Sequence, residues 1–280
     1  MRRHLRLFVT AARFDLVEHA RNRFAMVLVA LFIPSWISLA YAVIPSRHLT
    51  FKLRATGRLL APAGNQITQI TGAINAVTLI TGFMMFAVTF SGGRFDRRLA
   101  MAGYPRFHLI LAKTTSLTLA SGTIAAYATA VICVAWSPRQ PLQLAAALFC
   151  GAMTYGALGV VFGSLLRREV EGMFALVMTS LVDVGLQSPL AGGGTGSAIV
   201  GFLPTYGTMQ AATAAGFTHT PLPGNLAIQI LWFAGAALLG LLAFHRRTKD
   251  ALTTRPPLRL PWPLRRRRPA RPAKTASTPR

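Results

Sequence analysis

The sequence predicts an all-α polytopic membrane protein with six transmembrane helices. Of its 280 residues 52% are hydrophobic and only 13% are charged, whereas a soluble chain carries about 25% charged residues. The apolar residues are gathered in nearly uncharged runs, each long enough at about 1.5 Å per residue to cross, or nearly cross, a hydrocarbon core of about 30 Å. The predicted spans are residues 24–44, 70–90, 114–136, 142–166, 173–190 and 226–244, of which the fifth, with 18 residues, is the shortest.

The first 23 residues predict an amphipathic helix that lies in the membrane interface. Apolar residues at helical spacing share one face, whereas Arg6, Arg13 and Arg21 lie mostly off it; the apolar set is Leu5, Phe8, Val9, Ala12 and Leu16. The alternative is a charged arm without fixed structure. A cleaved signal peptide is not expected, because the first apolar run begins only after this basic segment and no small-residue cleavage site follows it.

The net charge of +23 invites a nucleic-acid hypothesis, but membrane topology accounts for it better. Six spans put both termini on one side, and that side then carries 25 of the 30 Lys and Arg residues, against 5 on the other. The positive-inside rule predicts cytoplasmic termini and a plasma-membrane location. The exception is the outer segment 45–69, which contains Arg47, Lys52, Arg54 and Arg58.

Two segments outside the spans have unusual compositions. The tail at 249–280 is rich in Pro and Arg and has no periodic apolar face, so we expect it to be disordered and to meet anionic lipid of the inner leaflet; RNA is the alternative partner. Residues 1–248 hold the N-terminal helix and the six predicted spans. Residues 191–225 contain no Lys, Arg, Asp or Glu and are broken by Gly and Pro. They predict a flexible glycine turn followed by short helices that re-enter the outer membrane face.

Polar and small residues inside the spans are candidate functional positions. Asp183 is the only acidic residue within a span, and such residues usually face the bundle interior or a wet cavity. It shares a polar stripe on the fifth span with Thr179, Ser180 and Gln187. Either this stripe lines a transport path or it is a hydrogen-bonded packing seam near the outer end of the span. In the fourth span Gly156, Gly159 and Gly163 predict close helix packing, within the subunit or at a dimer interface.

The motifs of common enzymes are absent. "LAKTTS" lacks the glycines of a phosphate-binding loop, and "GGGTGS" fails the dinucleotide fingerprint. The histidines lie outside the spans or at their ends, and Cys133 and Cys150 have no metal-ligand spacing. The sequence therefore predicts no catalytic residues, no metal site and no cofactor.

Residues 91–113, between the second and third spans, are basic and carry their own helical pattern. The run from Phe95 to Ala102 is long enough for about two helical turns, and Gly103 to Pro105 ends it. Phe95, Leu99 and Met101 give an apolar patch, whereas Asp96, Arg97 and Arg98 give polar groups. The alternative is a solvated loop whose arginines only fix topology.

This order of parts resembles the membrane subunit of a type-2 ATP-binding-cassette (ABC) exporter, the ABC-2 permease family. "RRLAMAGYPRFHLILAK" is similar to the family's segment after the second span, and "GSLLRREVEGMFALVMTSLVDVGLQSPL" followed by "LPTYGTMQAATAAGF" is similar to its fifth span and outer region. The likeness covers about residues 1 to 248. One departure is Gly93-Arg94, where the family often has an acidic residue.

The resemblance implies a partner and a mechanism. Such permeases pair with a second permease subunit, identical or different, and work with a separate cytoplasmic ATP-binding subunit. The segment with Phe95, Asp96, Arg97, Arg98, Leu99, Met101 and Tyr104 would then be a coupling helix in a groove of that ATPase. A secondary transporter or a non-catalytic membrane scaffold is the alternative, although a carrier is expected to hold several intramembrane ionisable groups.

Overall fold

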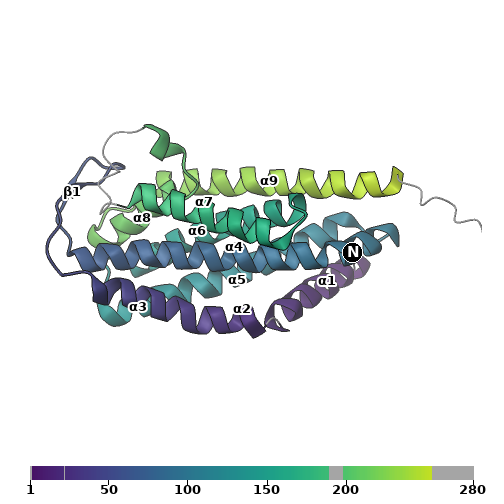
Figure 1. Cartoon of the computed structure of the whole chain (residues 1–280), viewed down its shortest axis with the longest axis horizontal. Helices are drawn as coiled ribbons and strands as arrows, with labels where there is room; N and C mark the ends of the chain where they lie inside the picture. The colour runs from purple at the N-terminus through teal and green to yellow at the C-terminus, as the bar shows by residue number, and fades with distance from the viewer. Residues whose placement is uncertain (1, 22, 189–197, 254–280) are drawn as a thin grey trace, which may run out of the picture.

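Helices laid side by side make up most of the chain in this computed structural model, which describes residues 2–21, 23–188 and 198–253. Figure 1 shows the long helices α4, α6 and α9 running along the long axis of the molecule. The N-terminal part comprises α1 (Arg2–Arg21), α2 (Arg23–Val27), a π-helical turn η1 (Leu28–Phe32) and α3 (Ile33–Val43). The rest comprises β1 (Phe51–Lys52), β2 (Leu59–Leu60), α4 (Gly64–Met101), α5 (Arg106–Ala135), α6 (Pro141–Leu165), α7 (Glu169–Gln187), a 3-10 turn η4 (Ala198–Phe202), α8 (Tyr206–Phe217) and α9 (Pro223–Thr253).

Five helical segments of the described chain are long and apolar enough to cross a membrane: Ala25–Val43, Gly64–Gly93, Phe107–Ala135, Pro141–Leu165 and Pro223–Ala243. They overlap the first, second, third, fourth and sixth predicted spans. The predicted fifth span corresponds to α7, which is not among these five. This helix has 19 residues, fewer than α4, α5, α6 or α9, and it carries three acidic residues, Glu169, Glu171 and Asp183.

Helix α6 lies at the centre of the bundle and packs against α4, α5, α7, α8 and α9. Its glycines allow the closest approach. A Cβ atom at Gly159 would collide with the carbonyl oxygen of Gly82 on α4, and one at Gly163 would lie 3.0 Å from the carbonyl oxygen of Phe86. Because these contacts are with backbone atoms, they leave no room for a side chain. Gly156 faces Leu117 of α5 and Thr81 of α4. The three glycines thus pack within the chain.

The first hydrophobic helix is irregular, and its sequence explains why. Pro34 has no N–H group, and its ring conflicts with a regular helical turn before it. The π-helical turn η1 lies directly before α3, which contains Pro34. The carbonyl oxygen of Ala30, four residues before the proline, accepts a hydrogen bond from the Tyr127 hydroxyl of α5 at 3.2 Å. A side chain from another helix therefore stabilises this irregular turn.

Three features differ from the sequence-based expectation. Segment 45–63 contains a small antiparallel hairpin, β1–β2, with Gly57 at a φ of 67° in its turn. The stretch at 95–101 is not a separate short helix but the uninterrupted end of α4, because the chain first breaks at Gly103, with a φ of 85°. Helix α9 continues to Thr253, so the start of the predicted tail is helical, whereas residues 254–280 lie outside the described part.

The two ends of the bundle differ in character. At one end α1 packs against α5 and α4, and the C-terminal turns of α4 and α9 lie at this same end of the bundle (Figure 1). At the other end lie the hairpin and α8, which are linked by a hydrogen bond of 3.1 Å from the Ala55 N–H to Gln210 Oε1. We refer to these as the α1 end and the α8 end.

Candidate functional site

The N-terminus of α8 is held by a buried carboxylate. Asp183 on α7 is 1% exposed. Its Oδ2 accepts hydrogen bonds from the Tyr155 hydroxyl at 2.7 Å and from the backbone N–H of Thr205 at 3.1 Å, and its Oδ1 accepts one from Gln187 Nε2. Thr205 is the N-cap residue of α8. Since the first N–H groups of a helix lack partners within it and carry partial positive charge, a carboxylate is well suited to this position.

Gln229 of α9 supports the same turn from the opposite side. Its side chain is fully buried, donates to Thr154 Oγ1 at 2.6 Å and to the carbonyl oxygen of Pro204 at 2.8 Å, and accepts from the backbone N–H of Thr208 at 3.1 Å. The start of α8 is therefore bonded to α6, α7 and α9 at once. Residues 204–208 with Asp183, Tyr155, Gln187, Thr154 and Gln229 are called the α8 clamp below.

The C-terminal end of α8 is fixed as well. The backbone N–H of Gln140 donates to the Ala215 carbonyl at 2.9 Å, and the Gln140 side chain donates to the Thr218 carbonyl at 2.8 Å. The Trp136 ring stacks on Phe217 with centroids 5.3 Å apart and donates to Gln69 Oε1 at 2.7 Å. Residues 207–216 are all buried. The uncharged helix α8 is thus enclosed by the bundle and held at both ends.

The polar stripe predicted on α7 divides into two parts. Ser180, Asp183 and Gln187 are buried and face other helices; Ser180 Oγ accepts a hydrogen bond from Asn75 Nδ2 of α4 at 3.1 Å. Thr179 is half-buried and donates to the carbonyl of Ala175 on its own helix at 2.7 Å. In this structure Asp183 is enclosed by protein donors. That geometry is the one expected of a packing seam between α7, α4, α6 and α8.

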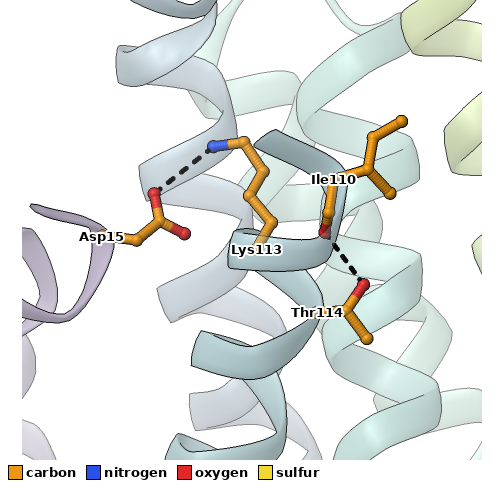
Figure 2. A network of polar contacts seen from close by, with 4 residues as sticks. All are labelled: Asp15, Ile110, Lys113 and Thr114. Atoms are coloured by element: carbon orange, nitrogen blue, oxygen red, sulfur yellow. Dashed lines mark hydrogen bonds and ion pairs between the residues drawn. The ribbon is translucent and has the colours of Figure 1, made fainter. Parts of the chain in front are cut away.

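An ion pair joins α1 to α5 at the other end of the bundle. Figure 2 shows Lys113 of α5 reaching toward Asp15 of α1, while Ile110 and Thr114 point away from that pair. The Lys113 Nζ to Asp15 Oδ1 distance is 3.8 Å, and the two side chains are 15% and 13% exposed. The Thr114 hydroxyl donates to the carbonyl of Ile110 at 3.0 Å. The N-terminal helix is therefore attached to the bundle through a partly buried charge pair.

The predicted coupling residues lie at the end of α4 and in the turn that follows. Arg98 is exposed, whereas Leu99 and Tyr104 are half-buried and line a pocket of about 340 Å³ between α1, α4 and α5. Partial burial raises the pKa of the Tyr104 hydroxyl above its usual value of 10.0. The side chains of Phe95, Asp96, Arg97 and Met101 lie outside the described part. Leu99 and Tyr104, two of the seven predicted coupling residues, therefore line a pocket of their own chain, and substitutions there would also disturb the packing of α1.

Several residues of these sites escaped the sequence analysis. Tyr155, Thr205 and Gln229 come from separate segments, and their partnership with α7 depends on helix packing that has no local signal. The one usable signal was Asp183 itself, since a buried carboxylate requires donors nearby. Asp15 and Lys113 were each visible as charges, but their pairing was not. Within residues 2–21, 23–188 and 198–253 there is no cluster of three or more His, Cys, Asp or Glu side chains that could hold a metal ion.

In comparisons with known proteins, no family model and no curated protein matches the chain.

Proposed function

We propose that the chain is the permease subunit of an ABC exporter of the type-2 class, which forms the translocation path and is driven by a separate ATP-binding subunit. In this proposal α2–α3, α4, α5, α6, α7 and α9 are the six spans. Helix α7 is counted as a span because only three residues separate it from the end of α6 and because its last two turns reach the α8 clamp. At about 1.5 Å per residue its 19 residues span about 28 Å, close to the thickness of a hydrocarbon core.

The observation that carries the proposal is the contrast between the two ends of the bundle. At the α8 end an uncharged helix of 12 residues is buried among the long helices, as a re-entrant outer segment would be. At the α1 end lie the N-terminal helix, the Asp15–Lys113 pair and the basic end of α4. The first end suits the outer membrane face, and the second, with most of the Lys and Arg residues, suits the cytoplasm.

The interior of the bundle is better suited to a transporter driven by ATP than to one coupled to an ion gradient. An ion-coupled carrier needs ionisable groups that alternate between the two aqueous sides. Asp183 is 1% exposed and is engaged by Tyr155, Gln187 and Thr205, so moving it into water would break the α8 clamp. This argument favours a permease powered from outside the membrane over a secondary transporter.

The proposal is tested by isolating the full chain from its own cells under mild detergent. We expect a second permease chain and an ATPase with a phosphate-binding loop to be present in fixed ratio, encoded next to this chain's gene. The isolated complex should hydrolyse ATP, and replacing the lysine of the partner's phosphate-binding loop should abolish that activity. Isolation of the chain alone, with no ATPase activity and no neighbouring ATPase gene, would overturn the proposal and favour a scaffold.

A further inference from the structure

A second pocket of the molecule is suited to an amphiphilic ligand. It encloses about 360 Å³ between α4, α5, α6 and α9, within the size range of ligand pockets. Both α5 and α9 pack against α6, and the pocket lies between them. Its walls are mainly apolar side chains such as Met85, Leu117, Val160 and Phe233. Leu238, at the pocket on α9, is 57% exposed, so the pocket opens sideways, out of the bundle.

The polar groups of this pocket are gathered toward the α1 end. The helices α4, α6 and α9 run from the α8 end to the α1 end, and α5 runs back. Thr89 lies one turn beyond Met85 on α4, and Ser164 lies two turns beyond Ala157 on α6. Lys113 lies one turn before Leu117 on α5, which is again toward the α1 end. The pocket is therefore apolar in the middle of the bundle and polar near its end.

The buried hydroxyl of Thr89 lacks a hydrogen-bond partner among the described residues. Thr89 is 6% exposed and lines the pocket. Thr114, which lines the same pocket, donates to a carbonyl of its own helix. Because a buried polar group without a partner costs free energy, an oxygen atom of a ligand would stabilise this position.

Positive charge flanks the polar end. The ammonium of Lys113 has three N–H donors, so it can pair with Asp15 and also face an anion. Arg246 of α9 is exposed and lies five residues beyond Leu241, which at about 100° per residue puts it on the opposite face of the helix from the pocket residues Ala237 and Leu241. No acidic side chain lines the pocket. An anionic headgroup at this end would therefore meet the ammonium of Lys113.

We propose that the pocket holds one acyl chain of an anionic membrane phospholipid. The Thr89 hydroxyl donates to an ester or phosphate oxygen, and Lys113 lies beside the phosphate. Moving an acyl chain from the bilayer into an apolar pocket gains little hydrophobic free energy. Affinity therefore depends on the headgroup, at about a fivefold change per cation.

Binding of phosphatidylglycerol and phosphatidylcholine to the delipidated full chain in detergent, read by native mass spectrometry, tests this proposal. We expect phosphatidylglycerol to bind more tightly, and Lys113→Gln to reduce its affinity about fivefold with little effect on phosphatidylcholine. Arg168→Gln, which removes an exposed cation between α6 and α7, is the matched control and should change neither.

Two further pairs of variants test the pocket itself. Ala237→Phe places a ring in the pocket and should weaken both lipids, whereas Ala234→Phe on the same helix, outside the pocket, should not. Thr89→Val should weaken phosphatidylglycerol binding. Thr81→Val is its control, because Thr81 lies on the same helix and its Oγ1 also lacks a partner among the described residues, but it does not line the pocket.

The proposal is overturned if Ala237→Phe and Thr89→Val bind phosphatidylglycerol as the unmodified chain does, or if the two lipids bind equally and Lys113→Gln has no effect. Should Ala237→Phe not fold, Leu238→Trp at the exposed pocket edge replaces it: quenching by phosphatidylglycerol with brominated chains is expected, and absence of quenching contradicts the proposal. None of these measurements needs the ATPase, so failure here leaves the exporter proposal intact.

Discussion

The Asp183 carboxylate on α7 lies 3.1 Å from the backbone nitrogen of Thr205, the residue that caps α8. A single acidic side chain inside an apolar helix thus fixes the start of a second helix 22 residues further along the chain. Since Tyr155 and Gln187 bind the same carboxylate, α6, α7 and α8 are joined at one point. Predictions about the stability of the bundle follow from this arrangement.

Removing the Asp183 carboxylate should destabilise the protein before it alters transport. Asp183→Leu leaves the Tyr155 hydroxyl and the Thr205 N–H buried without an acceptor, at roughly 1–3 kcal/mol for each donor. We expect a lower unfolding temperature in detergent and poor accumulation in the membrane. Asp183→Asn retains an acceptor oxygen and should be much milder. Thr179→Val is the control, because Thr179 bonds only within its own helix among the hydrogen bonds described. Normal folding of Asp183→Leu with a selective loss of export would instead support a role in the transport path.

The approach of α4 and α6 should not tolerate a methyl group at Gly159. A Cβ there collides with the Gly82 carbonyl, so Gly159→Ala has to separate two central helices, and such overpacking typically costs about 1–3 kcal/mol. Gly122→Ala on α5, where a Cβ meets nothing within 4 Å, is the matched control. Thermal unfolding of both variants checks this. Equal unfolding temperatures would mean that the packing of α4 on α6 is looser than described.

The Asp15–Lys113 pair should hold α1 against the bundle. Because both side chains are largely buried, we expect a coupling free energy near or slightly above the upper end of the range for exposed pairs, about 1 kcal/mol. A double-mutant cycle with Asp15→Asn and Lys113→Gln measures it, and amide hydrogen exchange over residues 6–17 reports whether α1 loosens. Additive single effects would show that the pair contributes nothing and that apolar contacts alone hold α1.

The six-span topology is tested with reporters that distinguish the cytoplasmic from the exterior side of the membrane. A reporter fused after Arg247 should report the cytoplasm, and one inserted at Gly194, which lies outside the described residues, should report the exterior. A third at Arg167, between α6 and α7, should report the cytoplasm again. If the reporters at Gly194 and Arg167 were found on the same side, α7 would not cross the membrane.

The sequence predicted the long helices well because their signal is local. Apolar runs of the right length determine the five membrane-length helices, and Gly103 marks the end of α4 just as the turn residues suggested. The hairpin at 51–60 was missed because each strand has only two residues, too few for an alternating pattern. The continuity of α4 into residues 91–101 was missed because the apolar run ends at Phe90 and a basic segment follows it, whereas the helix passes from one into the other.

Of the buried hydrogen-bond network at the start of α8, the sequence pointed to Asp183 as the key residue but gave no sign of its partners on other helices. Asp183 was identified because an intramembrane carboxylate is costly, but its partners Tyr155 and Thr205 depend on how α6 and α8 pack against α7. The same holds for Thr89, an ordinary residue of an apolar run until the structure places it in the pocket between α5 and α9. Contacts between segments distant in sequence have no local signature in a single chain.

The exporter proposal is tested most directly at the end of α4, where an ATPase partner would bind. In complexes isolated from cells that express the chain together with its ATPase partner, Arg97→Glu with Arg98→Glu should abolish association with the ATPase and ATP hydrolysis, while membrane accumulation stays normal because 25 basic residues share the topology signal. Arg167→Glu with Arg168→Glu, equal in charge change and also at the α1 end but in the turn between α6 and α7, is the control and should retain both. Leu99→Asp is less suitable, since Leu99 lines the pocket beside α1. Full association and ATP hydrolysis in the Arg97 and Arg98 double variant, or no ATPase with the unmodified chain, would contradict the account.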